Sequence, residues 1–314
     1  MWILLLLVST AQAQFGNFSY WGKKPGMRYY GSAYAGTGID GYAISGVPFK
    51  PDLVIIKAAT ANTGVLRTST MTGDSSKDTA AYTALEANLI QSLDSSGFSV
   101  GTDARVNTNG TTYYYMAFKN YDGEMEQGTY TGNGVDNRNI SATTFQPDYL
   151  IIIPPGANQV VFRNSAWGAG DLTNAYEGGP NFSGAIKALA GTGFQVGTAN
   201  TVNTNGSTYR WIAWKAIPKR IVVGSYVGNG VDDRNITGLG MQPEYLKINR
   251  DGGSGASHKS SFTGANTSMS YLALGNRVNE IQDLLIDGFQ VGTANPVNAN
   301  TSNYYYIAFR DSPN

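Results

Sequence analysis

Residues 130–140 read YTGNGVDNRNI, and this stretch decides the fold because the chain contains it three times. The same pattern stands as YAGTGIDGYAI at residues 34–44 and as YVGNGVDDRNI at residues 226–236, so successive copies are offset by 96 positions. A fixed period of this length is the signature of a tandem array in which every repeat forms one structural unit.

Two further landmarks recur in the same order. One is an apolar run after a proline, which reads PDLVIIK, PDYLIII and PEYLKIN in the successive copies. The other reads GFQVGTANTVNTNGSTYRWIAWK in the second copy and ends in aromatic residues that alternate with small ones. Together the landmarks define repeats over residues 31–119, 128–215 and 224–310, joined by two eight-residue linkers that permit limited bending.

The apolar residues inside a repeat alternate with a period of two, which is typical of strands. In the last run of the first copy, Tyr113 and Tyr115 fall on one face and Tyr114 on the other, so we expect a strand covered on both faces. The Asn109-Gly110 pair predicts the tight turn of a closing hairpin. We therefore predict an all-β fold of three tandem antiparallel β-sandwich modules, jelly-roll-like or immunoglobulin-like in topology.

The composition narrows the classes of function. Lys+Arg and Asp+Glu number 22 each, so no net field favours nucleic acid or an anionic membrane surface. The absence of Cys excludes disulfides and thiolate metal sites. The single histidine, His258, stands in the Gly/Ser-rich stretch DGGSGASHKSS and is predicted to be an exposed loop residue. A His-dependent active site in every repeat is therefore impossible, and we expect a binding or structural protein rather than an enzyme.

The N-terminus predicts export. Residues 2–8 read WILLLLV and are followed by the small-residue pattern Ala11-Gln12-Ala13, which together indicate a signal peptide over residues 1–13, although no Lys or Arg precedes the apolar run. The run is too short to span a bilayer, and no later segment is apolar enough to do so. We expect a secreted protein that is extracellular or attached to a cell surface.

The segment 14–30 belongs to no repeat and is rich in aromatic residues. Phe15, Phe18, Tyr20 and Trp21 make it too apolar for a leader that is merely solvated. One hypothesis is that it extends the first module as an edge strand. The other is that it pairs with a sheet edge of the next chain and drives self-association into a fibre.

Aspartates stand at the same place in each repeated turn, at Asp40, Asp136 and Asp232, and Asp233 adds a second carboxylate in the third copy. Carboxylate and carbonyl oxygens are the ligands that Ca²⁺ prefers, so a calcium loop is one hypothesis and Ca²⁺ is the one cofactor considered. The other hypothesis is that each Asp accepts backbone N–H groups of its own turn, which needs no metal. One reliable carboxylate per loop favours the second.

Two sets of aligned side chains are candidates for ligand contact. Basic residues recur 16 positions after the repeated proline, at Arg67, Arg163 and Lys259. Such cations either cover apolar surface at a strand end or contact a ligand. Aromatic residues of the last strand offer flat faces for sugar rings or partner strands, and we name Tyr114, Trp211 and Tyr305 as candidates. Core packing is expected for at least half of these aromatic positions.

The combination of Y-x-G-N-G-x-x-x-R-x-I, Q-P-D-Y-L-I-I, G-F-x-V-G-T and V-N-x-N-G-x-T-Y resembles a β-sandwich domain of tailed-phage tail and fibre proteins and of secreted bacterial or environmental proteins. The resemblance covers residues 31–310 and implies attachment to a host surface or a glycan. The apparent signal peptide favours a cell-surface or matrix protein instead. We therefore expect an extracellular adhesive protein that can form filaments. The alternatives are an array of carbohydrate-binding modules and an accessory domain of a hydrolase.

Overall fold

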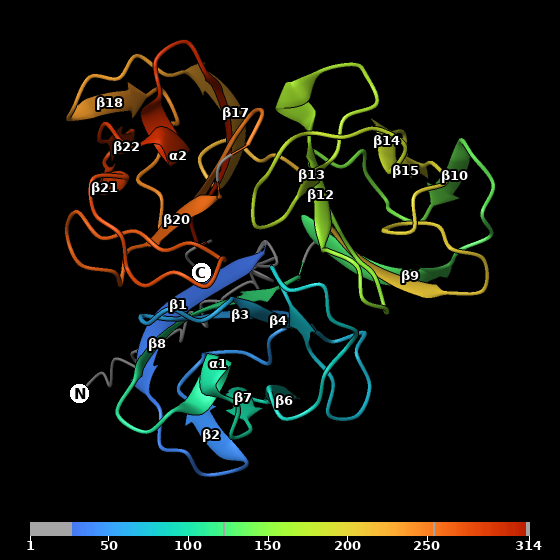
Figure 1. The fold of residues 1–314 in the computed structure, drawn as a ribbon, viewed down its shortest axis with the longest axis horizontal. Coiled ribbons are helices and arrows are strands. Elements are labelled where there is room, and N and C mark those ends of the chain that lie inside the picture. The colour runs from blue at the N-terminus through green and yellow to red at the C-terminus, as the bar shows by residue number, and fades with distance from the viewer. Residues whose placement is uncertain (1–26, 122, 254, 312–314) are drawn as a thin grey trace, which may run out of the picture.

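The computed structural model describes residues 27–121, 123–253 and 255–311, which fold almost entirely into β-structure. Figure 1 shows three lobes around a common centre, drawn in blue to teal, green to yellow, and orange to red. Six antiparallel sheets make up the lobes, two in each, and the prediction of an all-β sandwich fold is confirmed. The candidate assembly residues Phe15, Phe18, Tyr20 and Trp21 and the predicted signal peptide lie outside the described residues.

Lobe 1 pairs a five-stranded sheet with a three-stranded one. The larger sheet has the order β1 (Arg28–Ala35), β8 (Thr112–Lys119), β3 (Leu53–Ala58), β4 (Val65–Thr68), β5 (Lys77–Asp78). The smaller has the order β2 (Tyr42–Ser45), β7 (Gly97–Val100), β6 (Ile90–Asp94), and the short helix α1 (Ala104–Asn107) connects β7 to β8.

Lobes 2 and 3 repeat this plan. In lobe 2 the larger sheet has the order β9 (Met125–Thr131), β16 (Thr208–Trp214), β11 (Tyr149–Ile153), β12 (Val161–Asn164), β13 (Asn174–Ala175), and the smaller β10 (Arg138–Ser141), β15 (Gly193–Val196), β14 (Ile186–Ala190). A 3-10 turn, η1 (Ser165–Trp167), follows β12. In lobe 3 the larger sheet has the order β17 (Ile221–Val227), β23 (Asn303–Phe309), β19 (Tyr245–Arg250), β20 (Ser257–Ser260), and the smaller β18 (Arg234–Thr237), β22 (Gly288–Val291), β21 (Ile281–Leu285), with α2 (Asn295–Asn298) before β23.

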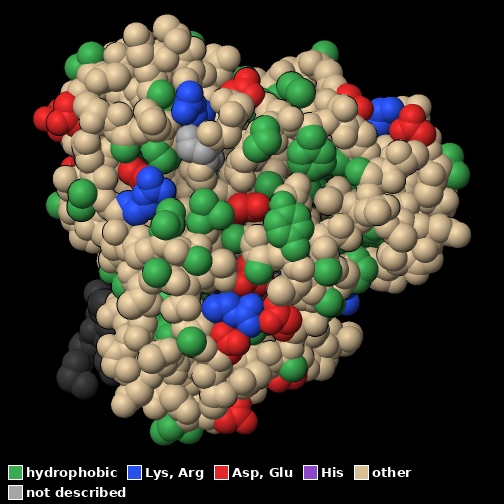
Figure 2. All heavy atoms as spheres, in the orientation of Figure 1, with side chains coloured by type: hydrophobic (Ala, Val, Ile, Leu, Met, Phe, Trp, Pro, Cys, Tyr) green, Lys and Arg blue, Asp and Glu red, His purple; other side chains and the backbone are tan. Residues whose placement is uncertain are grey.

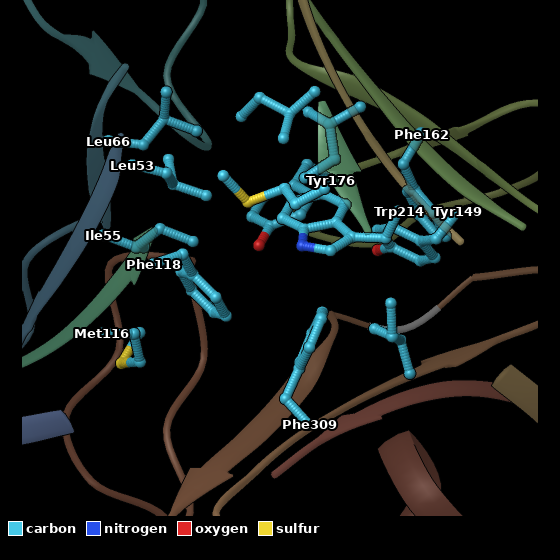
Figure 3. Packing of buried hydrophobic residues seen from close by; sticks show 14 of the residues in the cluster. Leu53, Ile55, Leu66, Met116, Phe118, Tyr149, Phe162, Tyr176, Trp214 and Phe309 are labelled. Carbon is cyan, nitrogen blue, oxygen red and sulfur yellow. The ribbon is translucent and has the colours of Figure 1, made fainter. Parts of the chain in front are cut away.

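A fourth hydrophobic core lies where the three lobes meet. It contains Leu53 and Phe118 of lobe 1, Trp214 of lobe 2 and Phe309 of lobe 3, which point toward one another in Figure 3. The Phe118 ring lies 5.1 Å from that of Phe309 and 6.0 Å from that of Trp214. Aromatic contacts of this kind bury large apolar areas, so the three lobes share one core in addition to their own. The limited bending expected at the joints stays a prediction.

This shared core explains why the central strands have no polar face. In β11, Leu150 and Ile152 point into the core of lobe 2, while Ile151 and Ile153 point into the shared core. Successive side chains of a strand face opposite sides of its sheet, so a strand between two cores must be apolar throughout. Tyr29 in β1 also joins the shared core and stacks on Tyr245 at 6.1 Å, which places the end of the 14–30 segment against its own chain.

The predicted closing hairpin does not form. Strand β7 pairs with β2 and β6 in the small sheet, whereas β8 pairs with β1 and β3 in the large one. The Asn109-Gly110 turn does have positive φ at Gly110, at 74°, but it joins one sheet to the other. The sequence pattern identified the turn correctly and could not show that the strands on its two sides belong to different sheets.

Main-chain hydrogen bonds between loops connect each lobe to the next. Leu85 of lobe 1 donates its backbone N–H to Pro155 of lobe 2 at 3.1 Å, and Ala256 of lobe 3 donates to Glu177 of lobe 2 at 2.6 Å. Asn276 of lobe 3 closes the ring by donating to the carbonyl of Ala59 in lobe 1 at 3.0 Å. Each lobe therefore contacts both of its neighbours through main-chain hydrogen bonds as well as through the core.

The prediction that His258 is an exposed loop residue is wrong. His258 lies in β20 and is fully buried, with its ring stacked on Tyr271 at a centroid distance of 4.0 Å. Its Gly/Ser-rich neighbours suggested a loop, but the strand starts at Ser257 and the loop ends before it. No helix in the described part of the chain has the length and apolar character that a membrane span requires.

Candidate functional site: a cleft repeated in the three lobes

The aligned cations of the sequence hold the loops that follow them. Arg163 is 3% exposed, and its guanidinium donates to the backbone carbonyls of Gly168 at 3.1 Å, Gly170 at 2.6 Å and Ile186 at 3.3 Å, and also to that of Leu172. A loop whose carbonyls point inward needs buried donors, and one guanidinium supplies several in a fixed fork. Arg163 therefore shapes the loop after β12.

Arg67 and Lys259 do the same in the other two lobes. Arg67 donates to the carbonyls of Gly73 at 2.6 Å, Ile90 at 3.2 Å and Met71 at 3.3 Å, and also to that of Ser75. Lys259, with a single nitrogen, reaches only Gly264 at 2.7 Å and Thr267 at 2.9 Å. Burial lowers the pKa of both Arg67 and Arg163, and lowers that of Lys259 to about 8.

A surface cleft opens above each of these cations. The cleft of lobe 2 has a volume of about 410 Å³ and that of lobe 3 about 380 Å³, while that of lobe 1 is smaller, at about 160 Å³. Apart from their cations, the clefts of lobes 2 and 3 share equivalent walls formed by Gln146 and Gln242, Ser165 and Ser261, Ala169 and Ala265, and Leu189 and Leu284.

The three clefts differ in the hydrogen bonds of their equivalent serines and in their charged lining. Ser69 in lobe 1 accepts a hydrogen bond from the side-chain amide of Gln127 of lobe 2. Ser165 in lobe 2 donates to Asp148 at 3.1 Å. In lobe 3, Asp283 and the exposed Arg310 also line the cleft, so it is the most charged of the three. Uncharged hydroxyl, amide and small apolar groups form most of the walls that lobes 2 and 3 share.

The candidate aromatic residues do not converge on a common site. Tyr114 of lobe 1 approaches the Asn276 amide of lobe 3 at 3.5 Å, and Tyr305 of lobe 3 packs on Trp167 of lobe 2 at 5.5 Å, so both lie at lobe junctions. Trp211 is 3% exposed and belongs to the core of lobe 2, with one edge at a shallow cleft beside Gln127. The sequence could not show this because the junctions bring together segments far apart in the chain.

The repeated aspartates tie the glycine turn to the neighbouring hairpin. Asp40 accepts from the Gln91 amide at 2.8 Å, Asp136 from Lys187 at 3.1 Å, and Asp232 from the Gln282 amide at 3.0 Å. Lys187 holds the pKa of Asp136 below its usual range through this hydrogen bond. Asp233 stands beside Asp232 in the same turn. Within the described residues, no group of three or more His, Cys, Asp or Glu side chains is placed to hold a metal ion.

A buried asparagine that the sequence reasoning did not single out anchors each glycine turn. In lobe 2, Asn203 accepts from the backbone N–H of Asn133 at 2.9 Å and donates to the carbonyls of Val135 and Gly197, both at 2.8 Å. Its counterparts are Asn107 and Asn298. The repeated Val-Asn pair was the available signal. A Cβ on Gly132 would stand 2.2 Å from the Thr204 carbonyl, so only glycine fits there.

The anchored turns present one exposed aliphatic residue each. Ile39 is 65% exposed, and Val135 and Val231 are each 58% exposed. On the face shown in Figure 2, Lys, Arg, Asp and Glu side chains lie in small groups among uncharged side chains. No protein-family model matches the chain, and a search of curated proteins finds none that is similar to it.

Proposed function

We propose that the chain is an extracellular adhesive protein that binds a repeating surface polymer, such as a glycan, through the clefts above Arg67, Arg163 and Lys259. The observation that carries the proposal is that a cleft stands at the same place in every lobe, over the same buried cation. The cations bind loop carbonyls and so support the walls of the clefts that they line.

A polymer suits this arrangement because the shared core holds the three lobes together. A repeating ligand that occupies one cleft presents its next units at high effective concentration to the others, so weak single-site binding adds up to useful avidity. The amide, hydroxyl and small apolar groups that the clefts of lobes 2 and 3 share suit sugar hydroxyls and ring faces. We assign no catalytic role to any residue of the clefts.

The test uses two exposed, equivalent alanines that line the clefts of lobes 2 and 3. The changes Ala169→Tyr and Ala265→Tyr should fill these clefts without touching the cores. On a glycan array, followed by titration calorimetry, we expect each single change to weaken binding a few-fold and the double change to weaken it by more than about tenfold, because avidity is lost.

The control is Ala43→Tyr, at an exposed position of β2 away from these clefts. Tyrosine suits an exposed strand position, so this variant should fold and bind like the parent. If the double variant binds every array ligand as well as the control does, the clefts are not the binding sites.

Self-assembly is a second candidate, favoured by the exposed aliphatic residues Ile39, Val135 and Val231 at the three turn tips. An apolar side chain repeated at one exposed place can contact a second copy of the chain. Sedimentation velocity should then show association that grows with concentration and is lost when all three residues are changed to Asn. A parent chain that stays monomeric at high concentration would exclude this route.

A further inference from the structure

Two polar residues of β19 occupy positions that are aliphatic in lobe 2. Lys247 and Asn249 face the centre of the molecule where Ile151 and Ile153 stand in β11. Lys247 is 1% exposed and Asn249 is 2% exposed. A buried amine beside a buried primary amide costs free energy unless both are fully hydrogen-bonded, so the pair needs an explanation.

The contacts of this pair are few and specific. The Nζ of Lys247 contacts Oδ1 of Asn249, lies 3.4 Å from the Tyr149 hydroxyl, and stands over the rings of Phe162 at 4.2 Å and Tyr176 at 4.4 Å. The Nδ2 of Asn249 is buried and has no hydrogen-bond partner among the described residues. Burial lowers the pKa of Lys247 well below its usual value, which favours the neutral, nucleophilic amine.

Lys57 is a second buried lysine, and its surroundings do satisfy an ammonium group. Its Nζ donates to three backbone carbonyls, those of Ala58 at 2.7 Å, Leu274 at 2.9 Å and Thr60 at 3.0 Å. Three oxygens satisfy the three donors of an ammonium. The Nζ of Lys247 instead meets one amide oxygen, one hydroxyl 3.4 Å away and two ring faces. These surroundings do not supply the three acceptors that an ammonium needs.

A carboxyl group and an imidazole complete the cluster. Glu177 follows Tyr176, whose ring lies against the Nζ of Lys247, and its Oε2 is buried with no partner among the described residues. Burial raises the pKa of Glu177 to about 7, so it can hold or release a proton near neutrality. His258 stands opposite Lys247 in the β19–β20 register, and both of its ring nitrogens are buried without a partner in the described structure.

We propose that Lys247 and Asn249 join in an intrachain amide bond, formed without any cofactor in the buried centre of the protein. The amine of Lys247 attacks Cγ of Asn249, and Glu177 takes the proton that Nζ loses. Glu177 then gives a proton to Nδ2, the Cγ–Nδ2 bond breaks, and ammonia leaves. One C–N bond forms and one breaks, no electron is transferred to an acceptor, and Glu177 ends in its starting state.

The geometry of a strand allows this bond. Residues two apart project from the same face, about 7 Å apart at the backbone, which is within the combined reach of a Lys and an Asn side chain. The amide carbon lies one C=O bond, about 1.2 Å, beyond the oxygen that Nζ already contacts. The product is a neutral secondary amide, so the core loses an ionisable amine and an unpaired amide nitrogen together.

Peptide mapping of the full secreted chain tests the proposal. Cleavage after acidic residues releases residues 245–251, and we expect this peptide to be lighter than its sequence by about 17 Da, the mass of the lost ammonia, with no fragment ions from breaks between residues 247 and 249. Trypsin should fail to cut after Lys247 in the denatured chain. A peptide of full mass with normal cleavage overturns the proposal.

Variants separate this bond from other losses of ammonia. The near-isosteric Glu177→Gln should leave the peptide at full mass, and Lys247→Met should do so as well. Lys57→Met, which removes a buried lysine outside the pair, should keep the loss of about 17 Da. If the loss persists in Lys247→Met, Asn249 has cyclised on its own backbone and the cross-link is excluded.

Discussion

Glu177 is the residue whose protonation we expect to affect stability most directly. Burial raises its pKa from 4.5 to about 7. The unfolded chain therefore releases this proton at lower pH than the folded chain does, so the contribution is fully present below pH 4.5 and is lost as the pH rises through 7. The loss should be about 3 kcal/mol in the free energy of unfolding.

Urea denaturation at pH 4.5, 6 and 7.5 checks this in the Lys247→Met background, with the added change Glu177→Gln as the control, because neither protein then carries the cross-link or a Lys247 amine. The free energy of unfolding of each protein is plotted against pH, and the slopes of the two plots are compared. A constant difference in stability caused by the substitution does not affect this comparison. Parallel slopes would show that Glu177 titrates normally in the folded state.

At the same scale, the sequence identified several side chains but not their partners. Arg67, Arg163 and Lys259 were singled out by alignment, yet their bonds go to carbonyls of loops that follow in the chain. A sequence shows that a cation recurs, but it does not show which way the following carbonyls point, because that depends on loop backbone angles.

At the scale of the element, the glycine turn depends on the buried asparagine beneath it. Asn203→Ala removes the hydrogen bonds to Asn133, Val135 and Gly197 and leaves buried backbone groups unpaired. We expect a loss of about 2–4 kcal/mol in the free energy of unfolding, because each buried group left without a partner costs about 1–3 kcal/mol. Chemical denaturation measures this.

Asn139→Ala is the matched control, since Asn139 is exposed in β10 and accepts one hydrogen bond from Gln195. An exposed substitution of this kind should change stability by less than about 0.5 kcal/mol. Equal effects at the two positions would mean that the turn does not need its anchor.

Strand existence was predictable from local pattern, and strand pairing was not. The alternation in residues 112–119 correctly indicated β8. The adjacent turn suggested that β8 pairs with β7, but β8 instead lies between β1 and β3. A tight turn fixes local geometry only, and here α1 turns the chain from one sheet to the other.

At the scale of the whole molecule, the shared core should make the three lobes unfold together. Trp214→Ala opens a cavity against Phe118 and Phe309 of the other lobes and should cost about 3–5 kcal/mol. Hydrogen exchange should then show reduced protection in β3, β11 and β19 alike. Phe194→Ala, in the core of lobe 2 alone, is the comparison and should reduce protection mainly in lobe 2.

The same core bears on the independence of the repeats. The prediction of three tandem modules implies that residues 128–215 fold as a separate module. In the structure this segment contributes Tyr149, Phe162 and Trp214 to the shared core, so an isolated copy would expose them. If Trp214→Ala affects lobe 2 only, the lobes are independent after all and the shared core contributes little.

The all-β class, the positions of the turns and the 96-residue period could be predicted from the sequence, because they depend on residue type and spacing along the chain. The packing of the lobes around one core, the burial of His258 and Lys247, and the place of the repeated cations in the walls of clefts became visible only in the folded chain. The closing of the lobes around one core depends on contacts between residues far apart in the chain, such as Tyr29 with Asp311, 282 positions away, and Asn164 with Tyr306, 142 positions away. No local pattern encodes such contacts, since they follow from which sheet faces meet when all three lobes pack together.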